Sequence, residues 1–351
     1  MKNVLFIFVF ALFFGNSPVF AKEPGLSTLE VYDDQQAYFP EKQWSVIADP
    51  KSMGWSKDRL AVAKKFSDSL QTSALMIIEN GVVVGAWGDL KKRYRAHSMR
   101  KSFLSALYGK PVQDGEIDLS STLGDLNIDD EPPLAPFEKV AMVSDLLKAR
   151  SGVYHFANFE TSSMRKKRPS RGSYDPGTHW YYNNWDFNAL LTIYEKQTGE
   201  KIFEQFENQI AKPIGMEQFR LKDTSYYRGK YSIHPAYTFR MSALDLGRFG
   251  LLFLRNGKWK DQQIIPKDWV AESTQSYSRT GNSSLYAGYG YLWWVGNIGY
   301  QAVGKSGHRL IVMPKKNLVI VHRVDTDQKH RVGSRDISKL LAFILDAKIK
   351  D

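Results

Sequence analysis

The sequence predicts an α+β fold, in which one antiparallel β-sheet is assembled from both ends of the chain and a helical segment is inserted between the two groups of strands. Three observations predict it. A helix and a β-hairpin come early, a helical stretch rich in Pro, Gly and charge fills roughly 110–230, and strand-like runs followed by a helix form the C-terminal third. Two consecutive domains would be the alternative, but the early hairpin alone is too small to be stable.

The N-terminus predicts export. Lys2 supplies a positive charge, an apolar run extends from Val4 to Phe14, and small enough residues follow up to Ala21. We therefore expect a signal peptide that is cut near Ala21, leaving a periplasmic or secreted protein. The apolar run is shorter than the roughly 20 residues that a membrane-spanning helix needs.

Composition excludes several classes of protein. The chain has 351 residues and no cysteine, so disulfides, cysteine catalysis and a lipid-modified cysteine are excluded. Its net charge of +11 favours contact with anionic cell-envelope polymers after export, and we expect neither a nucleic-acid partner nor a stable membrane anchor. The densest basic run, Arg165 to Arg168 with Arg171, is typical of a solvated loop.

The first elements follow an unpatterned segment. Residues 22–55 lack periodicity and are interpreted as an extended lead-in to a single domain over 56–351. A helix over 57–71 is predicted by apolar residues on one face, namely Leu60, Ala63, Phe66 and Leu70. Two β-rich runs flank Asn80-Gly81, which is the strongest short signal for a hairpin.

The middle of the chain predicts helices. Met99, Phe103 and Leu107 lie four residues apart, which indicates an amphipathic helix over 99–108, and Gly109 is expected to end it. Another helix is expected over 242–255, with Ser242 as its N-cap. Shorter helical pieces are expected at 139–149, 185–197 and 201–211.

The C-terminal third predicts strands. They are expected in the runs YGYLWWVG, YQAVG, HRLIVM and LVIVHRV, and Pro314 to Asn317 is expected to form the turn between the last two. An amphipathic helix closes the chain, with its apolar face formed by Ile337, Leu340, Leu341 and Ile344.

One motif in this region is misleading. The stretch GYQAVGKS, residues 299–306, matches the P-loop pattern G-x-x-x-x-G-K-[ST]. A P-loop must open a helix whose N-terminal amides hold phosphate, whereas the residues after Ser306 predict a strand. We therefore expect no nucleotide cofactor, and Lys305-Ser306-Gly307 needs another explanation.

The tetrapeptide Ser-Met-Arg-Lys occurs twice, at Ser98 to Lys101 and at Ser163 to Lys166. On a helix, residues i and i+3 are neighbours, so a lysine amine can lie beside the serine hydroxyl. A buried amine can lose its charge near neutral pH and accept a proton. Ser98 precedes an apolar helix, whereas Lys166 leads into a basic run ended by Pro169. We assign Ser98 and Lys101 as the chemical pair, although this pair alone fits an ordinary N-cap serine better.

Two further motifs change that balance. HWYYNNWDF contains Tyr-x-Asn in two overlapping registers, Tyr181 with Asn183 or Tyr182 with Asn184, and VGKSGH contains Lys-Ser-Gly. The order S-x-x-K, Y-x-N, K-[ST]-G resembles the serine β-lactamase-like superfamily, which includes class C β-lactamases, D,D-peptidases, related esterases and 6-aminohexanoate-dimer hydrolases. The resemblance covers about residues 50–350 and implies an antiparallel sheet flanked by the terminal helices, with a helical subdomain.

The resemblance implies a role for each motif. Ser98 would be the nucleophile, with Lys101 and Tyr182 sharing its proton; the family's spacing to Thr198-Gly199 favours Tyr182 over Tyr181. The backbone amides of Ser98 and His308 would form the oxyanion hole. Substrate would be bound by Asn184, Lys305, Ser306, Gly307 and His308, with Lys101 and Lys305 both supplying positive charge near Tyr182.

The expected function is hydrolysis of a small ester, amide or peptide through an acyl-enzyme on Ser98, with a β-lactam or cell-wall peptide among the candidate substrates. His308 and Arg309 are bulkier than the residues common at these positions in β-lactamases, which argues against efficient β-lactam hydrolysis. A catalytically silent binder of cell-wall peptides is the alternative. No metal site is expected, because His155, His179 and His234 lack ligand spacing.

Overall fold

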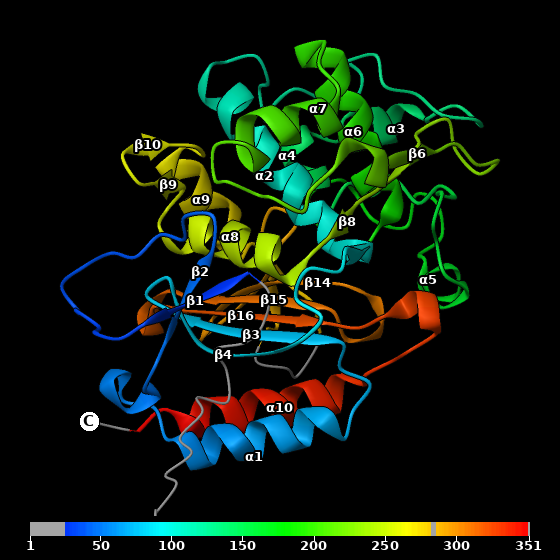
Figure 1. The fold of residues 1–351 in the computed structure, drawn as a ribbon. Helices are drawn as coiled ribbons and strands as arrows, with labels where there is room; N and C mark the ends of the chain where they lie inside the picture. Colours follow the sequence, from blue (N-terminus) through cyan, green and yellow to red (C-terminus); the bar gives the residue numbers. More distant parts are fainter. Residues whose placement is uncertain (1–24, 282–285, 350–351) are drawn as a thin grey trace, which may run out of the picture.

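The computed structural model describes residues 25–281 and 286–349, so the predicted signal peptide lies outside the described residues. Three layers are visible in Figure 1. Helices α1 (Lys57–Asp68) and α10 (Ser334–Ala347) pack together on one face of a large sheet, and α8 (Ala243–Leu254) packs on the other. The predicted α+β fold, with the sheet flanked by the N- and C-terminal helices, is therefore confirmed.

The sheet joins the two ends of the chain. Among the described residues its strand order is β1-β2-β4-β3-β16-β15-β14-β13-β12-β11, antiparallel except for the pairs β1–β2 and β2–β4. The strands are β1 (Leu26–Leu29), β2 (Trp44–Ile47), β3 (Ala74–Glu79), β4 (Val82–Gly88), β11 (Ser278–Arg279), β12 (Gly288–Tyr289), β13 (Trp294–Gly296), β14 (Gly299–Val303), β15 (Arg309–Met313) and β16 (Leu318–Arg323). Because β3 pairs with β16, early and late strands form one sheet, as the sequence predicted.

The central strands are apolar throughout because both faces of the sheet are covered. In β3, Met76 and Ile78 contribute to the core on the α8 side, whereas Leu75 and Ile77 contribute to the core on the α1–α10 side. The hairpin between β3 and β4 turns at Asn80 and Gly81, which have φ angles of 49° and 82°. Both angles lie in the left-handed region that Asn-Gly turns favour, so the predicted hairpin is confirmed.

The segment interpreted as a lead-in takes part in the sheet. Residues 22–55 include β1 and β2, which form one edge of the sheet. Trp44 of β2 is buried, and its indole Nε1 donates to the carbonyl oxygen of Leu244, 3.3 Å away. The two strands have four residues each and show no regular alternation of burial, which explains why their pattern is not visible in the sequence.

Helix α2 (Arg100–Gln113) is a core helix rather than an amphipathic one. Its side chains are buried from Arg100 to Gly109, and even Ser102 and Ser105 are satisfied internally by the carbonyls of Leu292 and Tyr291. The prediction that Gly109 ends the helix was wrong. A Cβ at this position would lie 2.8 Å from the Trp269 ring, so the glycine allows close packing instead of a stop.

The segment between α2 and α8 carries short helices and loops. They are α3 (Pro136–Lys139), α4 (Val143–Leu147), α5 (Ser162–Lys167), α6 (Asn184–Thr198) and α7 (Ile202–Gln205), the last continuing as a π-helical turn over Phe206–Ala211. Within the range 139–149, where one longer helix was expected, the structure has only the short α4. The N-cap of α8 is Ser242, as predicted, and its side chain accepts from the amide of Asp245.

Smaller elements complete the described residues. They are β5 (Tyr94–Arg95), β6 (Ser225–Tyr227), β7 (Ala236–Thr238), β8 (Arg240–Met241), β9 (Lys258–Trp259), β10 (Gln262–Gln263) and α9 (Lys267–Ser273). The run YGYLWWVG is split between β12 and β13 by a turn. Within the ranges that the structure describes, we find no helix with the length and apolar character required to cross a membrane.

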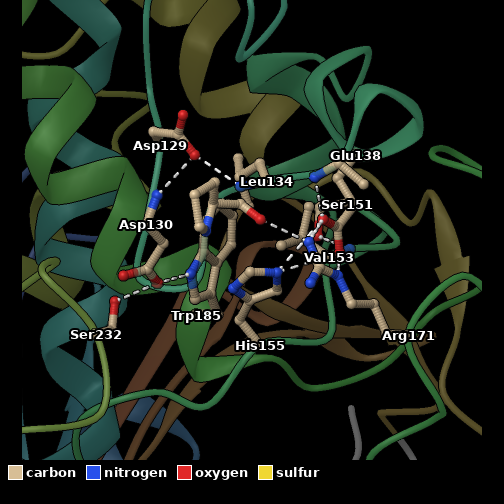
Figure 2. Close-up of polar contacts among 12 residues, drawn as sticks. Asp129, Asp130, Leu134, Glu138, Ser151, Val153, His155, Arg171, Trp185 and Ser232 are labelled. Carbon is tan, nitrogen blue, oxygen red and sulfur yellow. Dashed lines mark hydrogen bonds and ion pairs between the residues drawn. The ribbon is translucent and has the colours of Figure 1, made fainter.

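Buried polar contacts hold the start of α6 in place (Figure 2). The indole Nε1 of Trp185 donates to Asp130, 2.6 Å away, and Ser232 donates to the same carboxylate oxygen at 2.7 Å. Nearby, Glu138 accepts from Arg171 at 2.6 Å and lies 3.3 Å from the His155 ring nitrogen. The contacts of Asp130 therefore join two loops to Trp185, in the first turn of α6.

Glu138 should make the fold sensitive to acid. Burial alone would raise the pKa of Glu138, but hydrogen bonds from His155, Arg171 and the Ala135 amide outweigh it and lower the pKa to about 2. The stabilisation is therefore complete above the ordinary carboxyl pKa and is lost as pH falls towards 2. We expect Glu138→Gln to lower the free energy of unfolding by about 3 kcal/mol at pH 7, measured by denaturant titration.

The control for this prediction is Glu41→Gln. Glu41 is exposed and pairs with Lys260 on the surface, so its substitution should barely change stability. If Glu138→Gln loses as much stability between pH 5 and pH 3 as the wild-type protein, the acid sensitivity arises elsewhere.

The basic run is not a solvated loop, contrary to the sequence interpretation. Arg168 pairs with the buried carboxylate of Glu160 at 2.9 Å, and Arg171 pairs with Glu138. Lys166, Lys167 and Arg171 of the run are exposed, and Arg171 is nevertheless paired. The arginines are held because buried carboxylates on neighbouring segments need partners, which the local sequence does not show.

Candidate active site

Ser98 lies where a 3₁₀ turn, His97–Met99, leads into α2. Its side chain is partly exposed, whereas the next residues are buried. Strand β14 ends against the same turn, since a Cβ at Gly304 would lie 2.9 Å from the carbonyl oxygen of Ala96. The serine is therefore accessible while its backbone is fixed by the sheet and α2.

Lys101 is the buried partner of Ser98. Its Nζ lies 3.1 Å from Ser98 Oγ, one helical turn away, as the i, i+3 spacing predicts. The amine is 4.8 Å from the ring centres of both Tyr182 and Phe187, and no carboxylate among the described residues pairs with it. Burial lowers the pKa of Lys101 well below its ordinary value, and the charge of Arg100 lowers it further.

The second cation near Lys101 differs from the expected one. The sequence interpretation assigned this role to Lys305, but Lys305 is exposed on the turn after β14, and Arg100 is the charge that acts on Lys101. Arg100 precedes Lys101 on a helix that is buried on almost every side, so its guanidinium cannot reach water. Lys305 is not among the groups that lower the pKa of Lys101, although it lowers that of His97, the neighbour of Ser98.

Tyr182, and not Tyr181, lies beside the nucleophile. The Tyr182 hydroxyl hydrogen-bonds Ser98, whereas Tyr181 donates to the carbonyl oxygen of Met164. Burial raises the pKa of Tyr182, and the bond to Ser98 and the charge of Arg100 partly offset that increase. The ring stacks on Trp294 with centroids 5.7 Å apart, which orients the hydroxyl. Ser98, Lys101 and Tyr182 thus form one connected group.

Asn184 is the first residue of α6 and is buried near this group. Its Nδ2 donates to the carbonyl oxygen of Phe159 at 2.8 Å, and its Oδ1 has no partner among the described residues. Oδ1 is buried as well, so it is an unpaired acceptor inside the protein. Asn183, in the other register, caps α6 and donates to Asp186.

The Lys-Ser-Gly segment forms a tight turn, Lys305–Gly307, between β14 and β15. Ser306 has φ 66° and Gly307 has φ 103°, and a Cβ on Gly307 would lie 2.9 Å from Val332, so glycine is required there. The turn runs directly into β15. The P-loop interpretation is therefore excluded by the fold, because no helix follows Ser306.

His308 and Arg309 do not narrow the cleft as the sequence suggested. The His308 ring is fully buried, with its centre 5.2 Å from that of His97, and burial strongly lowers its pKa. Arg309 is also buried and donates to the carbonyl oxygen of His308 at 2.8 Å. The steric argument against β-lactams therefore does not hold, and any substrate contact of His308 is limited to its backbone.

The second Ser-Met-Arg-Lys copy forms α5, where Ser163 and Lys166 are both exposed. The helix ends at Lys167, and Arg168 before Pro169 is extended with ψ 128°, as proline requires of the preceding residue. The second copy therefore lacks the burial that favours a neutral lysine amine. The two copies therefore differ in burial, which is the property that the chemistry depends on.

Two neighbours of the site were missed in the sequence. They are Arg100, inside the first motif, and Trp294, which stacks on Tyr182. The two tryptophans of YGYLWWVG are evident in the sequence, but the sequence does not indicate that one of them stacks on Tyr182. Across residues 25–281 and 286–349, no group of three or more His, Asp or Glu side chains is arranged to hold a metal ion.

Comparisons with known proteins agree with the family resemblance and with the fold. The sequence model of the Beta-lactamase family matches residues 58–342. A candidate 6-aminohexanoate-dimer hydrolase from Bacillus anthracis superposes with a TM-score of 0.60 and 21% identity, covering 81% of this chain and 80% of its own. An octameric penicillin-binding protein homologue from Pyrococcus abyssi gives a TM-score of 0.59 and 17% identity, covering 82% and 77%.

One curated relative with no described function also matches this chain. An uncharacterized protein of Alkalihalophilus pseudofirmus is 19% identical over 258 residues, which are 65% of this chain and 72% of the relative. At these identities the solved structures establish the fold alone. The matched residues 58–342 include all three motifs but not β1 and β2.

Proposed function

This chain belongs to the beta-lactamase family, and from that premise we propose that it is a serine hydrolase that forms an acyl-enzyme on Ser98. The observation that carries the proposal is the 3.1 Å distance between Ser98 Oγ and Lys101 Nζ. Lys101 is buried, and no carboxylate among the described residues pairs with it. An amine in this environment favours its neutral form and can accept a proton. The hydroxyl of Tyr182 completes the group around Ser98.

In the proposed reaction, Ser98 Oγ attacks the carbonyl carbon of an ester or amide while its proton passes to the Lys101–Tyr182 pair. The carbonyl–heteroatom bond then breaks, and the proton returns to the departing alcohol or amine. Water repeats the sequence on the acyl-enzyme and releases the acid. Because Lys101 and Tyr182 are coupled, the proton belongs to the pair rather than to either residue.

The remaining motif residues would bind the substrate. The backbone amides of Ser98 and His308 would stabilise the oxyanion, at about 3 kcal/mol for each donor in the transition state. Lys305 and Ser306 lie on an exposed turn beside the nucleophile and would meet a substrate carboxylate. Asn184 would accept from a substrate amide through Oδ1. The proposed substrates are small esters, amides, peptides and β-lactams.

Covalent labelling tests this proposal against its alternative. A fluorophosphonate should add one phosphonyl group to Ser98, which intact-mass and peptide mass spectrometry would locate. A screen of esters, β-lactams and D-amino-acid peptides then identifies the substrate class. A chain that binds cell-wall peptides but accepts no adduct on Ser98 would be the catalytically silent binder.

We also propose that the protein is exported and contacts anionic cell-envelope polymers through a basic surface on α5 and the loop after β6. Exposed cations gather here, namely Lys166, Lys167, Arg228 and Lys230. Two arginines of α5 and its end stack on aromatic rings, Arg165 on Tyr231 at 4.4 Å and Arg168 on Phe156 at 4.0 Å. The surface therefore combines positive charge with rigid side chains.

A pair of double variants tests this surface. Lys166→Glu with Lys167→Glu should weaken binding to lipoteichoic acid at low salt by about tenfold, because two positive charges become negative. Lys315→Glu with Lys316→Glu changes the net charge equally at the exposed turn between β15 and β16. Equal losses for both double variants would mean that net charge, and not this surface, governs binding.

A further inference from the structure

Arg100 has an unusual environment for an arginine. It is 5% exposed, and no carboxylate within the described part of the chain pairs with it. Its Nη1 donates to the carbonyl oxygen of His97 at 3.2 Å, whereas Nε and Nη2 have no partner. A buried charge costs several kcal/mol unless it is paired, so an unpaired one calls for a functional explanation.

The surroundings of Arg100 are aromatic rather than acidic. Its guanidinium carbon lies 4.9 Å from the ring centre of Tyr237 and 5.6 Å from that of Phe159. These faces stabilise a cation without neutralising it, unlike a carboxylate. Its positive charge therefore acts on the adjacent site, which contains Lys101, the next residue in the chain, and Tyr182.

We propose that Arg100 is a positioning residue for catalysis, a permanent buried charge that keeps Lys101 neutral and so able to take the proton of Ser98. The mechanism is electrostatic repulsion, since two cations in a dry site cannot both stay charged at low cost. Arginine suits this purpose because it does not lose its proton at accessible pH. The inference rests on the proposed function of Ser98 but concerns the charge of Lys101 itself.

The direction of the effect does not depend on which residue is the formal base. Removing the charge of Arg100 would favour protonated Lys101 and would equally disfavour ionised Tyr182. Either change moves the pH at which the pair becomes basic upwards. The test therefore does not require that the proton be assigned to one member of the pair.

Other ionisable groups near the pair do not supply this charge. Burial raises the pKa of Tyr237 on β7 and of Tyr289 on β12, so both are neutral below pH 10. Burial also lowers the pKa of His97 to about 4, so it is neutral in the relevant range. On α6, Asp186 accepts hydrogen bonds from Ser151 and Asn183, and its charge raises the pKa of Tyr289. The exposed Lys305 lowers the pKa of His97.

The experiment titrates Lys101 directly, without a substrate. Protein labelled with ¹³C at the lysine ε-carbon is titrated by NMR, and the Lys101 signal is identified by its absence in Lys101→Arg. Arg100→Gln keeps a donor for the His97 carbonyl but removes the charge, and Arg100→Met is a second neutral variant. We expect both to raise the Lys101 midpoint by about one pH unit, and Arg100→Lys to keep it near the wild-type value.

The matched control is Arg248→Met. Arg248 is an equally buried arginine that donates to the carbonyls of Pro40 and Ile214, away from Ser98, so its loss should lower stability and leave the Lys101 midpoint unchanged. A neutral variant that folds and shows the wild-type midpoint overturns the inference. Failure of the proposed function would look different, since Ser98 would then accept no adduct while the midpoint still moved.

Discussion

Ser98→Ala is expected to abolish both covalent labelling and turnover while leaving the fold intact. The hydroxyl is the atom that would bond to the substrate, and removing a nucleophile of this kind costs on the order of 10⁴- to 10⁶-fold in rate. The Ser98 side chain is small and partly exposed, so its loss should change the unfolding midpoint little. The measurement is adduct formation with a fluorophosphonate together with a denaturant titration of each protein.

Ser163→Ala is the matched control, because it changes the same residue of the same tetrapeptide. Ser163 lies on α5 with an exposed Lys166, so this variant should label and turn over at the wild-type rate. Labelling that survives in Ser98→Ala but disappears in Ser163→Ala would reverse the assignment of the two copies.

Lys101→Arg is expected to lose two to four orders of magnitude in acylation rate, the usual range for general-base transfer. Burial, and then Arg100, lower the pKa of Lys101 well below its ordinary value of about 10.4. The wild-type rate should therefore rise with pH through an apparent pKa well below 10. Arginine keeps the charge but cannot give up its proton at accessible pH, so that rise should disappear.

The measurement is the rate of reaction with one activated ester from pH 5 to pH 10, for the wild-type and Lys101→Arg proteins. Because arginine is larger than lysine in a closed site, the unfolding transition of the variant is recorded as well, and Lys101→Met provides a smaller neutral replacement. A folded Lys101→Arg protein with the wild-type rate and pH profile would show that Lys101 serves only as a charge. The proton would then pass to Tyr182, and Tyr182→Phe should abolish the reaction.

The fold follows from the sequence wherever one local pattern decides the outcome. The hairpin at Asn80-Gly81 depends on left-handed backbone angles that these two residues adopt readily, and α10 depends on an apolar face that repeats along one helix. The edge strands β1 and β2 carry no such pattern. They form because β2 can hydrogen-bond to the edge of the sheet at β4, and because Trp44 donates to the carbonyl of a residue 200 positions away.

Helix α2 shows the limit of local rules. Gly109 is a helix stop by propensity, yet the helix continues to Gln113 because the glycine admits the Trp269 ring. The apolar spacing of Met99, Phe103 and Leu107 predicted one buried face, whereas the structure buries the polar face as well. Neighbouring elements from residues 269 and 291–292 supply that second environment.

By itself, the sequence determined which groups stand together along one helical turn. The i, i+3 spacing puts Ser98 and Lys101 one helical turn apart, where the hydroxyl and the amine can meet, and they lie 3.1 Å apart. Only the tertiary structure decided their chemistry, because the charge of an amine depends on water and on neighbouring charges. Phe187, Tyr182 and Arg100 bury and repel the charge of Lys101, while the same tetrapeptide on α5 lies in solvent. The local patterns, an apolar helix after Ser98 and a basic run before Pro169, predicted which copy would be buried, but the burial itself is made by residues distant in the chain.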